Sequence, residues 1–188
     1  MILISLGTQL PFSRYLEAVF NVAVKVPFFQ GQKIVVQMVG GGNFGIYRDM
    51  AGFYDLDVDF YEYLSADDYE VIFDRCDLVF SHAGMGGIIK CLERGKKLVV
   101  FPRRKVFGEH RNDHQLDTAK VFESGYQNIK VLFDEREIDG FFLSSAFSDF
   151  LDSEADGDSQ VSTWKINRDN FSRNLCELLL RVGRGGNL

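Results

Sequence analysis

All three histidines of the chain, His82, His110 and His114, lie in one segment that also carries a cluster of basic residues in an otherwise acidic protein. A glycine-rich turn begins at the first of them, with the sequence His-Ala-Gly-Met-Gly-Gly. Positive charge beside a glycine turn that starts a helix can bind a diphosphate, because free backbone N–H groups and cations then neutralise it without a metal. The alternative is that the glycines only allow tight packing and that the basic side chains are solvated, since such turns are weakly specific. The basic residues are Lys96, Lys97, Arg103, Arg104, Lys105 and Arg111.

Two other kinds of chemistry fit this segment less well. Glu109, His110 and His114 have a spacing that could chelate a metal on a helix, but Gly108 and the charged neighbours favour a loop, so we expect no metal site. Ser81 lies beside a histidine, yet it is not set in the Gly-x-Ser-x-Gly pattern of a nucleophile turn. The diphosphate hypothesis is therefore the one that the segment favours.

The elements around the glycine turn form a strand–helix–strand unit. Residues 77–81 predict a buried strand, residues 88–94 a helix that Gly95 ends, and residues 98–101 a second strand followed by a polar loop. In such units ligands bind at the carboxyl ends of parallel strands. The glycine turn and the charged loop are thus expected on one edge of a sheet.

The rest of the chain alternates strands with helices, which predicts an α/β fold with a parallel sheet. We expect one domain over residues 1–151 and an acidic loop over 152–163. A C-terminal amphipathic helix and tail over 164–188 would pack on the domain or on a partner, through Phe171 and Leu175. Further strands are expected at 2–6, 33–39, 57–63 and 129–133, and helices at 12–25, 67–74, 117–123 and, in part, 135–150.

Bulk composition excludes several classes of protein. The chain has 188 residues, 46% of them hydrophobic and 26% charged, which is typical of a soluble globular domain. A net charge of −6 argues against a nucleic-acid binder. Three cysteines without paired spacing, and no secretion signal, indicate a reducing cytoplasm. No apolar run approaches the roughly 18 residues of a membrane span, so membrane association is expected through a partner or a surface.

Three motifs in this order resemble the C-terminal domain of glycosyltransferase family 28. They are residues 6–12 (Leu-Gly-Thr-Gln-Leu-Pro-Phe), residues 81–87 (Ser-His-Ala-Gly-Met-Gly-Gly) and residues 112–115 (Asn-Asp-His-Gln). More narrowly, the chain resembles the donor-binding subunits of two-component GT-B enzymes. These include the soluble subunit of the eukaryotic lipid-linked N-acetylglucosaminyltransferase and PssE-related bacterial capsule and exopolysaccharide proteins. The resemblance covers residues 2 to about 126.

The resemblance implies a Rossmann-like parallel sheet with helices on both faces, the C-terminal half of a GT-B fold. It implies transfer of a hexosyl or glucuronosyl group from a UDP-sugar to a lipid-linked saccharide, without a metal or other cofactor. The acceptor half and the general base would come from a separate membrane-associated subunit, with His110 as the alternative base. That partner would hold the chain at the inner face of the membrane. The alternative function is a non-catalytic interaction subunit that keeps the fold but not donor binding.

The resemblance also implies which residues contact the donor. The diphosphate would be held by Gly7, Thr8, Gln9, His82, Ala83, Gly84, Met85, Gly86 and Gly87. The nucleoside would lie against Leu64, Ser65 and Glu93. The donor sugar would contact Arg103, Arg104, Glu109, His110, Arg111, Asn112, Asp113 and Gln115.

One position departs from the family pattern. Many family members carry a Glu that binds the ribose hydroxyls, five residues before the glycine that ends this helix, and here that residue is Lys90. Glu93 lies one turn further along the helix and could face the same way. Either Glu93 takes this role or the ribose is held by another group.

Overall fold

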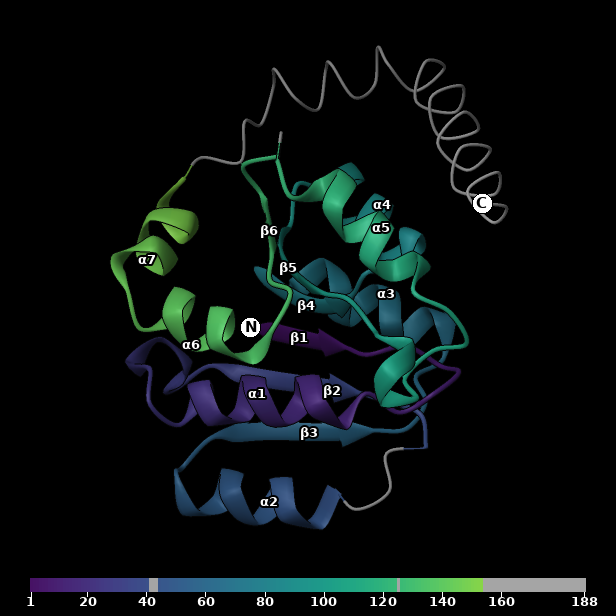
Figure 1. The fold of residues 1–188 in the computed structure, drawn as a ribbon. Coiled ribbons are helices and arrows are strands. Elements are labelled where there is room, and N and C mark those ends of the chain that lie inside the picture. Colours follow the sequence, from purple (N-terminus) through teal and green to yellow (C-terminus); the bar gives the residue numbers. More distant parts are fainter. Residues whose placement is uncertain (41–43, 125, 154–188) are drawn as a thin grey trace, which may run out of the picture.

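The computed structural model describes residues 1–40, 44–124 and 126–153 and contains a parallel six-stranded sheet (Figure 1). The strand order is β3-β2-β1-β4-β5-β6, and all five neighbouring pairs run parallel. The chain therefore builds one half of the sheet outward from β1 and the other half outward from β4. The strands are β1 (Ile2–Ser5), β2 (Lys33–Gln37), β3 (Asp57–Tyr61), β4 (Leu78–His82), β5 (Lys97–Phe101) and β6 (Ile129–Val131).

Helices cover both faces of this sheet, as expected for parallel strands joined by crossovers. One face carries α1 (Ser13–Ala23), α2 (Phe44–Phe53), α6 (Glu135–Phe142) and α7 (Ser145–Asp152). The other face carries α3 (Ala66–Arg75), α4 (Met85–Glu93) and α5 (His114–Phe122). Two short 3₁₀ helices, η1 (Pro27–Phe29) and η2 (Lys105–Phe107), complete the described elements.

Alternating side chains along the strands supply two separate cores. In β4, Leu78 and Phe80 point to the α1 side, and Val79 points to the α4 side. In β5, Val99 and Phe101 pack with the first group and Leu98 with the second. Both faces of the central strands are buried, which explains why these strands appear in the sequence as continuous apolar runs.

The predicted α/β fold is confirmed, and the differences are one additional helix and shifted element boundaries. The structure adds α2, which the sequence did not predict because only Phe44 and Ala51 of its ten residues are buried. Helix α4 begins at Met85, so Gly86 and Gly87 belong to its first turn. Helix α5 begins at His114, three residues earlier than expected, since the N–H of Leu116 already donates to the carbonyl of Asp113.

The chain beyond Ser153 lies outside the described residues. This covers nearly all of the predicted acidic loop and the whole predicted C-terminal helix with Phe171 and Leu175. In the part of the chain that is described, no helix is both long enough and apolar enough to cross a bilayer.

Candidate functional site

A cleft of about 380 Å³ opens at the carboxyl ends of β1, β2 and β4. Its walls come from the loop after β1, the loop after β3, the first two turns of α3 and the start of α4. Ligands of open α/β sheets bind at this edge, where the chain leaves neighbouring strands in opposite directions. In this sheet that point lies between β1 and β4. The lining residues are Ser5, Gly7, Thr8, Gln37, Tyr63, Leu64, Ala66, Tyr69, Glu70, Ser81, His82 and Gly87.

A chain of polar side chains forms the floor of the cleft. The hydroxyl of Tyr69 donates to Ser5 Oγ at 3.4 Å, and Ser5 Oγ donates to Gln37 Oε1 at 3.4 Å. Gln37 is only 3% exposed, and its Nε2 donates to the carbonyls of Gly7 and Glu62, both at 3.3 Å. These bonds fix the loops after β1 and β3 relative to each other. The cleft is thus bounded by a preformed polar network.

Gly7 and His82 come close together across the junction of β1 and β4. Gly7 has φ +89°, and a Cβ atom placed there would lie 3.1 Å from His82 Nε2. A Cβ on Gly84 would lie 2.7 Å from His82 Cε1, and one on Gly87 would lie 3.2 Å from Ser81 Oγ. The imidazole therefore lies against two glycines, and a side chain at either position would force it to shift. Gly7, Gly84 and Gly87 therefore have a steric cause in the sequence pattern, which Gly86 does not share.

His82 is a neutral group at physiological pH. Burial is the main cause that lowers its pKa to about 4, and the nearby Arg103 and His110 act in the same direction. Its Nδ1 lies 3.3 Å from Ser81 Oγ. A neutral imidazole can donate or accept a hydrogen bond at the cleft, but it does not supply the positive charge for an anion.

That positive potential comes instead from the beginning of α4. The first N–H groups of a helix have no intrahelical partner, and they carry the positive end of the helix dipole. Gly84 occupies the N-cap position, Gly86 is exposed, and Gly87 faces the cleft. A Cβ on Gly86 would meet no atom within 4 Å, so the backbone is open to a ligand there. The start of α4 is suited to a phosphate group.

The loop between β5 and α5 is organised by a buried arginine. Arg103 is 2% exposed, and its guanidinium donates to the carbonyls of Leu6 (2.6 Å), Leu10 (2.5 Å) and Glu109 (3.2 Å). Its backbone N–H donates to Gln115 Oε1 at 3.1 Å. Arg103 therefore connects the loop after β1 to the loop after β5.

A second arginine, Arg14 of α1, contacts the same loop. It forms a bidentate ion pair with Glu109, with Nε–Oε1 at 2.6 Å and Nη2–Oε2 at 2.8 Å. Its guanidinium lies 4.5 Å from the ring centroids of both Phe101 and Phe107. Glu109 Oε2 also accepts from the N–H of Arg104. Both carboxylate oxygens of Glu109 thus already accept hydrogen bonds within the protein.

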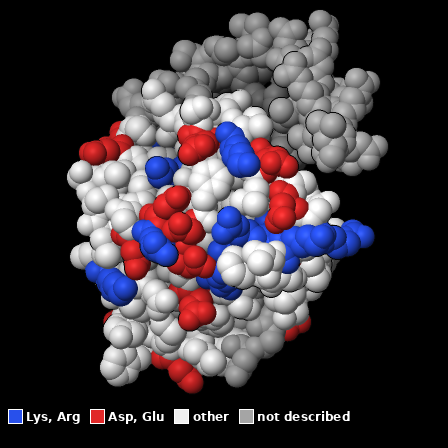
Figure 2. All heavy atoms as spheres, in the orientation of Figure 1, with Lys and Arg blue, Asp and Glu red and all other residues white. Residues whose placement is uncertain are grey.

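None of the residues expected near the donor sugar lines the cleft, and the remaining ones lie in the loop after β5 or at the start of α5. Asp113 Oδ1 accepts from the N–H of Lys105 at 2.8 Å, and Gln115 is buried. The rings of His110 and His114 are 4.4 Å apart, and both contact Asn112 Oδ1. Lys105 and Arg111 are exposed. Figure 2 shows basic side chains projecting on the right of the view, where Figure 1 places this loop.

The residues expected near the nucleoside separate into two groups. Leu64 lines the cleft. Ser65 instead caps α3, because its hydroxyl accepts from the N–H of Asp68 at 3.1 Å. Glu93 is exposed and does not line the cleft. Of the residues expected near the diphosphate, Gly7, Thr8, His82 and Gly87 line the cleft, whereas Gln9 is exposed outside it and Ala83 is buried in the core.

Sequence reasoning missed several lining residues. Ser5, Gln37 and Ser81 are polar side chains at or next to the carboxyl ends of apolar strands, a signal that was present in the sequence. Tyr69 and Glu70 follow Ala66 at the three- and four-residue spacing that places side chains on one face of a helix. Only the packing of α3 against the sheet shows that this face borders the cleft.

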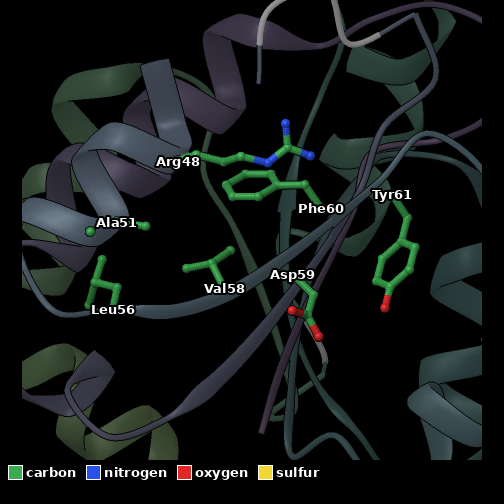
Figure 3. A pocket seen from close by; sticks show the side chains of 8 residues that line it. Arg48, Ala51, Leu56, Val58, Asp59, Phe60 and Tyr61 are labelled. Atoms are coloured by element: carbon green, nitrogen blue, oxygen red, sulfur yellow. The ribbon is translucent and has the colours of Figure 1, made fainter. Parts of the chain in front are cut away.

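A second hollow of about 400 Å³ lies between α2 and β3, away from the junction of β1 and β4. Figure 3 shows the guanidinium of Arg48, from α2, over the ring of Phe60, from β3, at 5.5 Å. Asp59 points away from this stack. Arg48, Asp59 and Tyr61 are the polar side chains labelled here, and they come from α2 and β3, away from the start of α4. We therefore take the first cleft as the candidate site.

No cluster of three or more His, Cys, Asp or Glu side chains suited to a metal ion occurs among the described residues. Glu109, which the sequence placed near the histidines, is turned toward Arg14. Glu109 therefore does not join His110 and His114 in a set of metal ligands.

Comparison with known proteins gives two kinds of similarity. The chain is 48% identical to the human UDP-N-acetylglucosamine transferase subunit ALG13 over 46 residues, which are 24% of this chain and 4% of the human protein. The solution structure of ALG13 has a TM-score of 0.52 at 19% identity, with 78% of this chain and 85% of that chain covered. MurG of Acinetobacter baumannii has a TM-score of 0.54 at 14% identity, with 82% and 45% covered. At these identities, the structural likenesses establish the fold.

The family model of the glycosyltransferase family 28 C-terminal domain matches residues 1–139. The match includes all six strands and the entire cleft. Its extent, together with the parallel sheet and the cleft at the junction of β1 and β4, leads to one conclusion. The chain belongs to the glycosyltransferase family 28 C-terminal domain family.

Proposed function

We propose that this chain is the donor-binding subunit of a UDP-sugar-dependent glycosyltransferase. One observation carries the proposal: a cleft with a polar floor lies beside the open start of α4, in a chain of family 28. The diphosphate of the donor would bind at Gly86 and Gly87, with Gly7 and Thr8 on the facing wall. The nucleoside would extend toward Leu64 and α3.

The acceptor half is proposed to reside on a separate, membrane-associated subunit that presents a lipid-linked saccharide. The supporting observation is that human ALG13, a relative over 46 residues, is described as a subunit of a UDP-N-acetylglucosamine transferase. Exopolysaccharide or capsule synthesis is the proposed setting, and the partner would hold the chain at the cytoplasmic face of the membrane. The partner would also supply the general base, and no metal would be needed.

Separate calorimetric titrations with UDP and with ADP, in buffer without added metal, test the proposal. UDP is expected to bind and ADP to bind more weakly. A folded protein that binds neither nucleotide would contradict donor binding and favour the non-catalytic interaction subunit. Sugar transfer is expected only after the acceptor subunit is added.

Gly86→Asp gives a sharper version of this test. Residue 86 has open space around it, and an acidic side chain in the first turn of a helix interacts favourably with the helix dipole, so the variant is expected to fold. The new carboxylate would repel a diphosphate, and UDP affinity is expected to fall at least roughly tenfold. Gly52→Asp in α2 is the matched control, because residue 52 is also helical and a Cβ there would also meet no atom within 4 Å. Equal UDP affinity in the two variants would exclude the start of α4 as the phosphate site.

A further inference from the structure

We propose that Glu70 of α3 is the carboxylate that binds the ribose hydroxyls of the nucleotide, and that Lys90 of α4 is the residue that positions it. The inference rests on the donor-binding function proposed above, and it names the group that selects a ribonucleotide. The ribose-binding carboxylate is thereby placed on α3, whereas Glu93 lies on α4.

The composition of the cleft is the first argument. Of the described residues that line it, Glu70 is the one whose side chain is charged at neutral pH. A vicinal diol offers two hydroxyl donors, and a carboxylate is the side chain that can accept both. Dinucleotide-binding α/β domains use an acidic residue for a ribose hydroxyl in this way. Glu70 lies on the α3 wall, whereas the proposed phosphate site is at the start of α4, so a nucleoside can reach it from there.

The fixed position of Lys90 is the second argument. Its Nζ lies 2.6 Å from Glu70 Oε1, and 4.4 and 4.5 Å from the ring centroids of Tyr69 and Phe73. The side chain of Lys90 is 21% exposed and that of Glu70 is 51% exposed. The ammonium group is therefore held by two rings and one carboxylate, while the carboxylate itself remains open to the cleft.

The geometry leaves Glu70 with accepting capacity. Arg94 is 4.0 Å from its Oε2, beyond hydrogen-bond distance, so Oε2 is available for a hydroxyl. The hydrogen bond from Lys90 lowers the pKa of Glu70, which keeps the group ionised. Lys90 thus uses one lone pair of Oε1 and leaves Oε2, with its two lone pairs, for the hydroxyls of the ligand.

Comparing UDP with 2′-deoxyuridine diphosphate tests the inference by calorimetry. The unmodified chain is expected to prefer UDP by roughly tenfold or more, the size of a charge-assisted hydrogen bond. Glu70→Gln is expected to lower UDP affinity and reduce this preference to within about twofold. Glu93→Gln, an acid-to-amide change on exposed α4 surface, is the matched control and is expected to leave the preference unchanged.

Lys90→Met tests the positioning role, because Met retains an apolar stem over Tyr69 and Phe73. It is expected to weaken UDP binding in the presence of Glu70 and to have no further effect in the Glu70→Gln background. A preference for UDP that survives Glu70→Gln would overturn the inference but leave donor binding intact. Loss of UDP binding in Glu93→Gln would assign the ribose to α4 and overturn it as well. If the unmodified, folded chain binds neither nucleotide, the proposed function fails together with the inference.

Discussion

The guanidinium of Arg103, in the loop after β5, donates a hydrogen bond of 2.6 Å to the carbonyl of Leu6, directly after β1. The strand between them, β4, ends at His82. The same guanidinium is 3.5 Å from the position that a Cβ of Gly7 would take. A side chain buried behind the cleft thus sets the place of the loop that forms one of its walls.

Arg103→Met is expected to destabilise the fold by about 3 kcal/mol. The change leaves the carbonyls of Leu6, Leu10 and Glu109 without their donor in a buried region. Urea unfolding followed by circular dichroism measures the loss. Arg111→Met, at an exposed position of the same loop, is the control and is expected to change stability by less than about 0.5 kcal/mol. Equal effects of the two substitutions would contradict the role of Arg103.

Two glycines of the α4 region are expected to respond differently to alanine. Gly84→Ala places a methyl group 2.7 Å from His82 Cε1, so the imidazole must shift, at a cost of about 1–3 kcal/mol. Gly86→Ala meets no atom within 4 Å and gains helix propensity, which is expected to stabilise the protein by up to about 1 kcal/mol. Thermal unfolding distinguishes the two. Destabilisation by both variants to the same degree would show that the packing of His82 is not what requires Gly84.

The depressed pKa of His82 predicts a loss of stability in mild acid. The unfolded chain takes up a proton near pH 6.5, whereas the folded chain does so only near pH 4, so the unfolded state binds more protons between these values. The free energy of unfolding is therefore expected to fall as the pH falls from about 6.5 to about 4. His82 alone contributes roughly 2 kcal/mol of this loss between pH 7 and pH 5.

Urea unfolding of the unmodified chain and of His82→Asn at both pH values isolates this contribution. The variant is expected to lose about 2 kcal/mol less than the unmodified chain over the same interval. Carboxylates and His114, whose pKa is also lowered by burial, titrate in both proteins and cancel in the difference. If the free energy of unfolding falls by the same amount in both proteins, His82 is not the cause of the loss of stability in acid.

Arg14→Lys is expected to destabilise the protein by about 1–2 kcal/mol even though it keeps the charge. An ammonium group cannot reproduce the bidentate pair with Glu109 or the contact that a delocalised guanidinium makes with Phe101 and Phe107. Chemical unfolding measures the change. Lys120→Met, which removes the exposed 3.7 Å pair with Asp117, is expected to leave the unfolding midpoint unchanged. A midpoint for Arg14→Lys equal to that of the unmodified chain would mean that only the charge of Arg14 is used.

The central part of the fold was accessible from sequence for clear physical reasons. Strands buried on both faces appear as uninterrupted apolar runs, as in β4 and β5, and the glycines at the N-cap and in the first turn of α4 indicated a strand-to-helix turn. Helix α2 was missed because it buries too few side chains to produce a periodic pattern. The pattern of apolar residues that identified the core strands therefore cannot identify a helix that lies mostly in solvent.

The cleft was only partly accessible from sequence, because its walls are set by packing. Gly7 and His82 belong to recognisable motifs, but Glu70 reaches the cleft only because α3 packs against the sheet with this face toward it. The row of cations in the loop after β5 gave no indication that Arg103 turns inward while Lys105 turns outward. Sequence spacing alone could not assign these two neighbouring positive charges to different environments.

The pairing of β1 with β4 has a consequence for how the chain folds. Ile2 lies opposite Leu78, so the central contact of the sheet joins segments that are distant in the sequence. Contacts of this kind form slowly, because a long loop must close before any of their stabilisation is gained. Gly7 and His82 belong to those two segments, and the cleft cannot exist until they have met. A nucleotide in the cleft would therefore recognise only the assembled sheet, and the time course of nucleotide capture during refolding would report when its two halves join.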